Sequence, residues 1–431
     1  MRHLSRAMGL IVLALLAGAL LGLLAPGAGP KVAPLAKWVL QLIKAAATPL
    51  VFFAVLEAIL RFRVAGSDFF KLLVIVLINA SLAMAVGLTI ANLFEPGQYL
   101  KAIIGAAQPA LDTVDLGDLL VQQLPVSVVQ PFADNSIMSL VILAVALGFA
   151  WRRVGLRQDT DAAVVMTRAE TLVSILRELC ETLLLWIVRL VPVAVFAASA
   201  RVTAEHGLHP FAGLGKYVVL CLLGMAIHMA FTYSAWLVLF VRKTLREFWR
   251  RALEPVFYAF SVNSSLVALP LTLRALDDLG VSRRASTLAA CVGTNLNNDG
   301  IILYEGFTLL ALAQAAGLEL SLAAQLVAAV YCIIAAMGVA GVPEAGVVAL
   351  TLVLGGLGLP TEALAMLLSV DWIIARARSL LNTTSDMVGS TVLDCWLHRS
   401  GAAPAGLSFE PSGGAAAPRP ARSPDDQRGI P

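Results

Sequence analysis

Long apolar runs separated by short polar stretches dominate the first 241 residues. Six runs approach or exceed the ~20 predominantly apolar residues that a helix needs to cross a bilayer. They fall at about 8–25, 34–60, 70–94, 136–154, 172–200 and 211–241. The first run follows Arg2 and Arg6 and so looks like a signal peptide. Because further spans follow it, we interpret it as a retained helix of a polytopic membrane domain.

Basic residues between these runs gather on one side. Loops that follow an even-numbered span carry many of them: Arg61, Arg63, Arg152, Arg153, Arg157, Arg242, Lys243, Arg246, Arg250 and Arg251. The opposite loops carry few, chiefly Lys31, Lys101 and Arg201. Cytoplasmic loops are enriched in Lys and Arg. The distribution therefore predicts a cytoplasmic N-terminus.

Composition agrees with a membrane protein. The 431 residues are 59% hydrophobic and 14% charged, whereas soluble domains carry about a quarter charged residues. An ordinary cytosolic enzyme and a disordered chain are thus both disfavoured. The net charge of +3 is mild and indicates no nucleic-acid partner. The five cysteines stand singly and predict neither disulfides nor a zinc site. No nucleotide or nucleophile motif is recognisable, so we predict no catalysis.

After residue 250 the apolar segments become shorter. Residues 252–262 and 266–276 flank Asn263-Ser264-Ser265, and residues 323–337 and 347–359 flank a glycine-rich stretch, 338–346. Each pair predicts a re-entrant helical hairpin with a non-helical tip. Irregular backbone at membrane depth is tolerated only against protein or a water-filled cavity. Two interrupted segments in corresponding positions indicate a transporter's binding site.

Between the two hairpins, residues 284–313 contain the polar stretch from Gly293 to Gly300. Its side chains point all around a helix, so a regular lipid-facing helix is excluded and a break is expected. Carbonyl oxygens freed by a break, together with a carboxylate, are suitable ligands for an alkali cation. A buried polar network that only packs helices is the alternative interpretation.

The last span, at about 361–397, has one polar face. The residues of this face are spaced 4, 3, 4 and 4 apart: Asp371, Ala375, Arg378, Asn382 and Asp386. Ionisable groups inside a span indicate a functional site. Arg378 is suited to bind a carboxylate, and Asp386 a cation or proton. Arg376 lies about 140° from Asp371 around the helix. The alternative is that Asp371–Arg378 and Asp386–Arg376 merely neutralise one another.

These features resemble the dicarboxylate/amino acid:cation symporter family, the glutamate transporter homologues. The resemblance covers about 8–397 and includes the motifs Pro49-Leu50-Val51-Phe52, Leu93-Phe94-Glu95-Pro96-Gly97, Leu269-Pro270, Asn297-Asn298-Asp299-Gly300 and Gly341-Val342-Pro343. It implies an all-α membrane fold of eight transmembrane helices plus two re-entrant hairpins, with inverted repeats. It also implies a homotrimer and an elevator-like movement of the hairpin-bearing half.

By position, the resemblance implies two sets of site residues. The substrate set is Ser264, Ser265, Val342, Pro343, Gly346, Asp371, Arg376, Arg378, Ser379 and Asn382. The cation set is Gly293, Asn297, Asp299, Asn382 and Asp386, with sodium as the metal and no other cofactor. Gly293, Asn297 and Asp386 match one sodium site, and Asp299 with Asn297 matches part of another.

This chain also departs from the family pattern. A three-serine run reads Asn263-Ser264-Ser265-Leu266, and Asn298 and Ile301 replace a Met and a Thr of the Asn-Met-Asp-Gly-Thr run. A Tyr-x-x-Thr-Ser pattern in the third span reads Val76, Asn79 and Ala80, so the inner sodium site loses side-chain oxygens. Ala375 stands where amino-acid carriers have the aspartate that pairs with the substrate ammonium.

The sequence thus predicts a symporter that couples sodium or proton influx to uptake of a C4 dicarboxylate such as succinate, fumarate or malate. A sodium-coupled acidic or neutral amino acid symporter is the alternative, and a degenerate non-transporting paralogue or anion conductance a third. We expect one transmembrane domain, 1–399, in a bacterial inner membrane, with both termini cytoplasmic. Its scaffold lies mainly in 8–241 and its transport core mainly in 251–397. Residues 400–431 should be a disordered tail.

Overall fold

The computed structural model describes residues 2–61, 66–101, 124–155, 161–241, 245–338, 345–356 and 364–399. Their regular secondary structure is helical throughout. Three helical stretches in this part of the chain are long and apolar enough to cross a membrane: Pro26–Glu57, Ser67–Phe94 and His209–Phe240. The pair Thr167–Val188 and Val191–His206, bent by 42°, makes a fourth if it is one span. The predicted all-α class is confirmed, and the count of eight spans stays a prediction.

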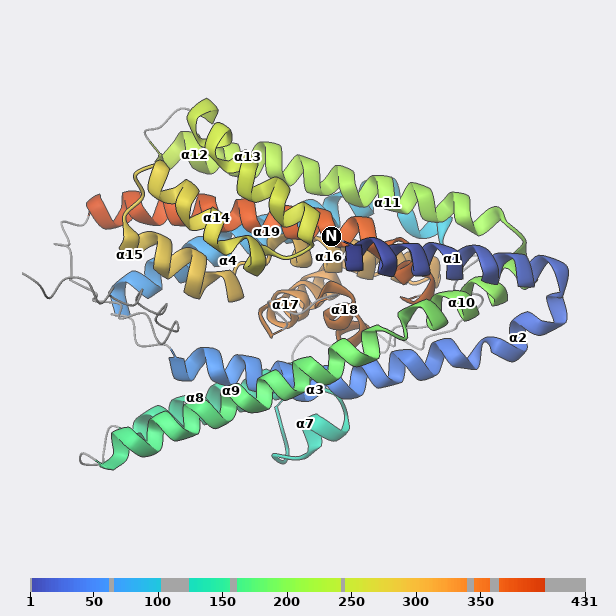
Figure 1. Cartoon of the computed structure of the whole chain (residues 1–431), viewed down its shortest axis with the longest axis horizontal. Helices are drawn as coiled ribbons and strands as arrows, with labels where there is room; N and C mark the ends of the chain where they lie inside the picture. Colours follow the sequence, from blue (N-terminus) through green and yellow to red (C-terminus); the bar gives the residue numbers. More distant parts are fainter. Residues whose placement is uncertain are drawn as a thin grey trace, which may run out of the picture.

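Five helices from the first half form one layer of the molecule (Figure 1): α1 (Arg2–Leu24), α3 (Pro34–Arg61), α8 (Ile137–Gly155), α9 (Asp161–Val188) and α10 (Val191–His206). α1 runs along α10, and α3 packs against α8 and α9. Gly18 and Gly22 permit the first contact, because a Cβ on Gly18 would lie 2.3 Å from the Phe196 carbonyl oxygen. Small residues four apart allow this close helix packing in membranes.

The other long helices of the first half pack against helices of the second half. α4 (Gly66–Phe94) packs against α16 and α19, as does α11 (His209–Ile227). α11 continues through a π-helical turn, η3 (His228–Tyr233), into α12 (Ser234–Phe240). Short elements connect these helices: η1 (Pro26–Ala28), α2 (Gly29–Val32), η2 (Pro96–Tyr99) and α7 (Gln130–Ala133).

In the second half, two pairs of helices occupy the segments predicted to form hairpins, and their re-entrant character stays a prediction. α13 (Leu245–Val262) and α14 (Ser265–Asp278) pack together, as do α17 (Leu322–Gly338) and α18 (Ala345–Gly356). α17 and α18 contact α16 on one side and α3 and α8 on the other (Figure 1). They therefore lie between the five-helix layer of the first half and the buried helix α16. Val342 and Pro343, at the tip of the second hairpin, lie outside the described residues.

The predicted break between the hairpins is present. After α15 (Arg283–Ser286) the chain forms a π-helical turn, η4 (Thr287–Val292), and a 3₁₀ turn, η5 (Gly293–Asn295). Regular helix resumes only at α16 (Asp299–Ala315). The last helix, α19 (Leu364–Arg399), contacts α13, α14, α16 and α18. The break and both hairpins therefore meet along α19.

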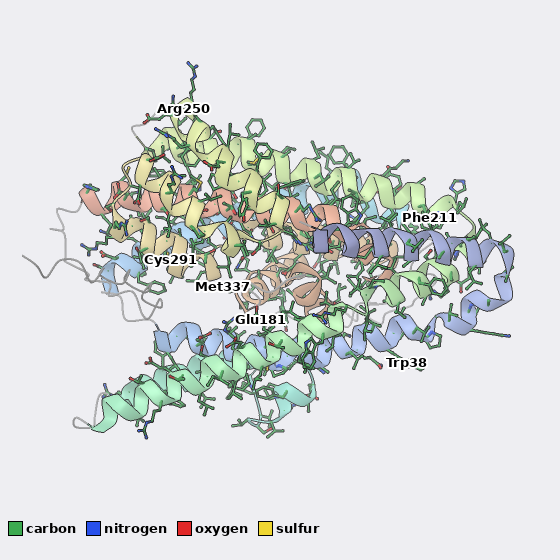
Figure 2. The ribbon with its side chains drawn as sticks, viewed as in Figure 1. Trp38, Glu181, Phe211, Arg250, Cys291 and Met337 are labelled. Carbon is green, nitrogen blue, oxygen red and sulfur yellow. The ribbon has the colours of Figure 1, made fainter. Side chains whose placement is uncertain are left out.

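Large apolar side chains cover much of the outer surface. Trp38 projects away from α3 with 60% of its surface exposed (Figure 2). Trp186 and Phe231 are similarly exposed on α9 and η3. In α16, by contrast, every residue but Gln314 is buried. Apolar groups outside and polar groups inside are the distribution expected of a protein whose surroundings are lipid.

Candidate functional site

The polar face of α19 points into the protein. Asp371, Ala375, Arg378, Asn382 and Asp386 are all buried. Their spacing keeps them on one side of the helix, and that side meets α16 and the hairpins. The predicted face is therefore confirmed as a continuous buried strip of polar groups.

At one end of this strip Arg378 and Asp371 form a bidentate ion pair. Arg378 Nη1 lies 2.6 Å from Asp371 Oδ1, and Nη2 lies 2.9 Å from Oδ2. The Arg378 guanidinium carbon also lies 4.3 Å from the centre of the Tyr304 ring of α16. The two charges neutralise each other, and the guanidinium is held in a fixed plane. A bidentate pair takes two of an arginine's five N–H donors.

The two hairpins approach Arg378 from different sides. Gly346, at the start of α18, lies so close that a Cβ there would be 2.8 Å from the guanidinium carbon. From the first hairpin, Asn263 accepts a hydrogen bond of 3.2 Å from the Ser379 hydroxyl. Asn263 has φ 54°, in the left-handed region, and Ser264 caps α14 by accepting from the Val267 N–H. This geometry places Ser264 and its neighbour Ser265 at the tip that faces α19.

Asn382 connects the middle of the strip to the broken segment. Its Oδ1 accepts a 2.8 Å hydrogen bond from the Gly300 N–H, and its Nδ2 donates to Asn298 Oδ1 at 3.3 Å. Asn298 in turn donates to the Ala336 carbonyl of α17. Gly300 is required here, since a Cβ would lie 2.6 Å from the Arg378 carbonyl oxygen. Asn382 thus lies between the arginine and the carboxylate ends of the strip, as predicted.

At the other end, Asp386 is surrounded by neutral groups. It accepts a 2.7 Å hydrogen bond from the Thr294 hydroxyl and a 3.3 Å one from the Asn297 amide. Gly293 begins the same turn and is also buried. Within the described part of the chain, no basic side chain forms an ion pair with Asp386. A buried carboxylate with a hydroxyl beside it offers oxygen atoms of the kind that hard cations bind.

Asp299 lies at the N-terminus of α16 in a different setting. One of its oxygens, Oδ2, accepts from the Asn79 amide, from the Ser385 hydroxyl at 2.6 Å and from the Tyr233 hydroxyl at 3.0 Å. His228 Nε2 lies 3.5 Å from the same oxygen. The sequence analysis named Asp299 but not His228, Tyr233 or Ser385 as its neighbours. His228 and Tyr233 are polar side chains inside the sixth span, and polar residues inside a span are a sign of function.

Two further charged residues bear on the site. Arg376 donates to the Trp372 carbonyl at 2.5 Å and lies over the Trp372 ring, both on its own helix. Its role in substrate binding stays a prediction. Glu305 on α16 is fully buried, and neither of its carboxylate oxygens has a hydrogen-bond partner among the described residues. Glu305 was not among the residues predicted from the sequence, although a glutamate in a buried span is itself a signal of function.

A family model for the sodium:dicarboxylate symporter family matches residues 8–396, nearly the whole chain. This chain belongs to that family. A C4-dicarboxylate transport protein 3 of Ralstonia nicotianae is 28% identical over 403 residues, which cover 90% of this chain and 88% of that protein. A C4-dicarboxylate transport protein of Anaeromyxobacter sp. (strain K) is 27% identical over 414 residues, 92% and 91% of the two chains.

Amino acid carriers are similar as well. The neutral amino acid transporter B(0) of Homo sapiens is 29% identical over 281 residues, which cover 64% of this chain and 50% of that protein. Membership in a family of symporters, with apolar helices on the outside, identifies this chain as a multi-pass membrane transport protein. Its relatives include both dicarboxylate and amino acid transporters, so family membership alone does not determine the substrate.

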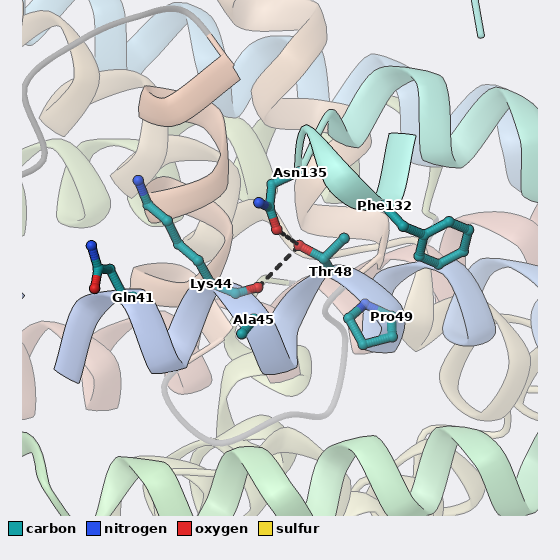
Figure 3. Close-up of a pocket in the computed structure, with 7 residues that line it drawn as sticks. All are labelled: Gln41, Lys44, Ala45, Thr48, Pro49, Phe132 and Asn135. Atoms are coloured by element: carbon teal, nitrogen blue, oxygen red, sulfur yellow. Dashed lines mark hydrogen bonds between the residues drawn. The ribbon is translucent and has the colours of Figure 1, made fainter. Parts of the chain in front are cut away.

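A separate cavity lies outside the strip of the symporter site. It has a volume of about 540 Å³ and is lined by Gln41, Lys44, Ala45, Thr48, Pro49, Phe132 and Asn135 (Figure 3). Thr48 Oγ lies 3.0 Å from the Lys44 carbonyl oxygen and 2.5 Å from Asn135 Oδ1. Pro49 has no N–H to donate to the Ala45 carbonyl within α3. None of these residues was predicted to contact substrate.

Proposed function

We propose that this protein is a secondary symporter that takes up a small C4 dicarboxylate, such as succinate, fumarate or malate, together with cations. The observation that carries the proposal is the arrangement around Arg378. Ala375 lies one turn away, is buried and offers no charge. Both oxygens of Asp371 face the guanidinium. An amino acid bound here would bury an ammonium group without a partner, which is heavily penalised.

A dicarboxylate has no such requirement. We propose that the Arg378 guanidinium, held in place by Asp371, binds one substrate carboxylate beside the ion pair. Gly346 and the tip at Asn263 would enclose it from the two hairpins, with Ser264 and Ser265 on the first. Val342, Pro343, Ser379, Asn382 and Arg376 complete the substrate set that we propose.

The cation site that we propose is centred on Asp386. Thr294 and Asn297 already donate hydrogen bonds to this carboxylate, and we assign Gly293 and Asn382 to the same site. Family membership supports sodium as the coupling ion. Each net positive charge that moves inward down the membrane potential contributes about 2.3 kcal/mol of driving free energy per 100 mV. A few cations therefore offset a dianion and still drive its accumulation.

Glu305 favours a proton as a second coupling ion. Burying an ionised carboxylate without a partner is costly, so a buried carboxyl of this kind favours exchange of a proton. The Cys332 thiol of α17 lies near it and is only a weak donor. If the proton is carried here, Glu305→Gln removes the dependence of uptake on a pH gradient and leaves its dependence on sodium.

The wider arrangement is also a proposal. We place the chain in a bacterial inner membrane as a homotrimer of eight-span protomers with two re-entrant hairpins and cytoplasmic termini. The hairpin-bearing core, mainly 251–397, would move against the scaffold. The contacts of α4 and α11 with α16 and α19 support counting these two helices with the core.

A competition panel in proteoliposomes tests the substrate. Uptake of labelled succinate is measured against excess unlabelled C4 dicarboxylates, aspartate, glutamate and neutral amino acids. The proposal expects fumarate or malate to inhibit strongly and aspartate weakly. Preference for aspartate would instead favour an acidic amino acid symporter, with Asp371 as the partner of the ammonium group. Uptake of none of them, with an anion current alone, would favour a degenerate conductance.

A further inference from the structure

The family resemblance implies a second sodium site at Asp299, built with side-chain oxygens from the third span. The residues present do not fit it. The relevant positions on α4 are Val76, Asn79 and Ala80, all buried. Two of the three have no oxygen on their side chain. The third, Asn79, directs its amide nitrogen, a donor, at Asp299 Oδ2 and at the Ser385 hydroxyl, 2.7 Å away.

The remaining neighbours of Asp299 are donors as well. The π-helical turn η3 carries His228 and Tyr233 five residues apart, with ring centres 5.0 Å apart, and both reach the same carboxylate oxygen. π-helical turns are frequent at functional sites because they re-aim side chains. Thr232 Oγ lies 3.1 Å from His228 Nδ1. A hydroxyl that donates to Nδ1 leaves the proton on Nε2, which then faces Asp299 as a donor.

Asn79 and Tyr233 donate to Asp299 Oδ2, and His228 Nε2 and the Ser385 hydroxyl lie 3.5 and 2.6 Å from the same oxygen. The one Ser385 hydrogen serves either this oxygen or Asn297 Oδ1, which is 2.9 Å away. The hydrogen atoms of these donors present positive ends to the position that a cation would need. Hydrogen bonds of this kind stabilise a carboxylate in place of a counter-ion. Asp299 Oδ1 and Asn79 Oδ1 have no hydrogen-bond partner among the described residues. With Asn297 Oδ1, which the Ser385 hydroxyl links to Asp299, these make three side-chain oxygens, about half of the roughly six that a hard cation collects.

We propose that Asp299 in this chain binds no coupling ion, and that hydrogen-bond donors of the protein itself occupy the place of the cation. The proposal rests on the proposed symport function, which it refines. Cation coupling then depends on the Asp386 site, and transport uses one sodium ion fewer than a family member with both sites. The network also ties η3 of the sixth span to the break before α16.

Thermal unfolding against sodium concentration separates the two carboxylates. The purified protein is titrated with NaCl, with choline chloride holding the ionic strength constant, as wild type, Asp386→Asn, and Asp386→Asn/Asp299→Asn. We expect Asp386→Asn to lose the saturable sodium-dependent rise in Tm, and the double variant to behave identically. If Asp386→Asn keeps a saturable rise that Asp299→Asn then removes, Asp299 binds sodium and the proposal is wrong.

A second measurement does not depend on those variants folding. The slope of log substrate affinity against log sodium concentration is compared between wild type and Val76→Tyr/Asn79→Thr/Ala80→Ser, which restores the family's oxygens. We expect the slope to be steeper by about one in the triple variant, because one more ion is linked to binding. A wild-type slope of two or more that Asp299→Asn lowers by one would overturn the proposal.

Failure of the symport proposal would look different. Wild-type protein that shows no gradient-driven uptake of any acid contradicts symport, whatever the sodium titration gives. Wild-type protein that transports with protons and ignores sodium supports the absence of a sodium ion at Asp299. That result contradicts only the sodium assignment at Asp386.

Discussion

The two ends of the polar strip on α19 differ in how their charges are balanced. Arg378 has a counter-ion, Asp371, on its own helix and an aromatic ring across from it. Asp386 is just as buried, but its described neighbours Thr294 and Asn297 are neutral. The Arg378–Asp371 pair is therefore neutral before any ligand arrives, whereas Asp386 has no counter-ion among the described residues.

This difference accounts for coupling without a direct contact between the ligands. A dianion beside the neutral Arg378–Asp371 pair makes a buried region more negative, and uncompensated buried charge is costly. A cation at Asp386, on the same face of the helix, lowers that cost. Each ligand thus favours the other, and thermodynamic linkage requires the effect to be equal in both directions.

The largest effect is expected at the arginine end. Arg378→Ala removes the guanidinium that binds the substrate carboxylate, and it leaves Asp371 as a buried, unpaired charge. Breaking a buried pair costs about 3–5 kcal/mol, or a few hundredfold to several thousandfold in substrate affinity. Substrate affinity is measured by calorimetric titration.

The double variant Asp371→Asn/Arg378→Gln is the matched control, because it removes both charges and keeps their approximate volume. If Arg378 binds substrate, the double variant folds but does not transport. Transport by the double variant would mean that the pair only neutralises itself, and the substrate assignment would be lost.

At the carboxylate end we expect Asp386→Asn to weaken the link between cation and substrate. Coupling free energies of about 1–3 kcal/mol correspond to 5–150-fold in affinity. Substrate titrations at several sodium concentrations should lose that dependence in the variant while Arg378 still binds substrate weakly. An unchanged sodium dependence would show that Asp386 is not a coupling ligand.

Ala375→Asp should change which anion the arginine end accepts. The new carboxylate would repel a dianion and pair with an ammonium group, and like charges placed together cost several kcal/mol. We expect aspartate to compete about tenfold better relative to succinate than in the wild type. Ala375→Asn, similar in size but neutral, is the control. If both variants shift the preference equally, size rather than charge sets the selectivity.

A smaller effect is expected at Gly346. A Cβ there would lie 2.8 Å from the Arg378 guanidinium carbon and would displace the guanidinium from its position beside Asp371. We predict that Gly346→Ala lowers substrate affinity by about tenfold, or ~1.4 kcal/mol, without changing the sodium dependence. Gly215→Ala, on α11 where a Cβ meets open space, should have no effect on affinity. Equal losses in both variants would argue against a special role for the contact with Arg378.

Much of this arrangement was predictable because it is encoded locally. Two pairs of short apolar runs predicted the hairpins, polar side chains all around one segment predicted the break at Gly293–Gly300, and a regular spacing predicted the face of α19. The rest depends on contacts between distant segments. Asn79 and Asp299 are 220 residues apart, and nothing in either neighbourhood shows that they meet. The π-helical turn that aims His228 and Tyr233 likewise leaves no periodic signal.

Side-chain conformations could not be predicted from the sequence either. Spacing placed Arg376 away from the polar face, and the structure adds its hydrogen bond to the Trp372 carbonyl. Thr294 was part of the polar segment, but only the unwound backbone turns its hydroxyl toward Asp386. The second hairpin tip, with Val342 and Pro343, lies outside the described residues, so those two assignments stay predictions.

Gradient-driven uptake of labelled succinate by the unmodified protein in proteoliposomes tests the central claim most directly. Vesicles loaded with potassium and diluted into sodium, with or without a pH gradient, are compared with vesicles in which the ion gradients have been collapsed. We predict accumulation above equilibrium only with an inward cation gradient, and stimulation by an inside-negative potential. Succinate that only equilibrates, regardless of the gradient, would contradict symport through this site.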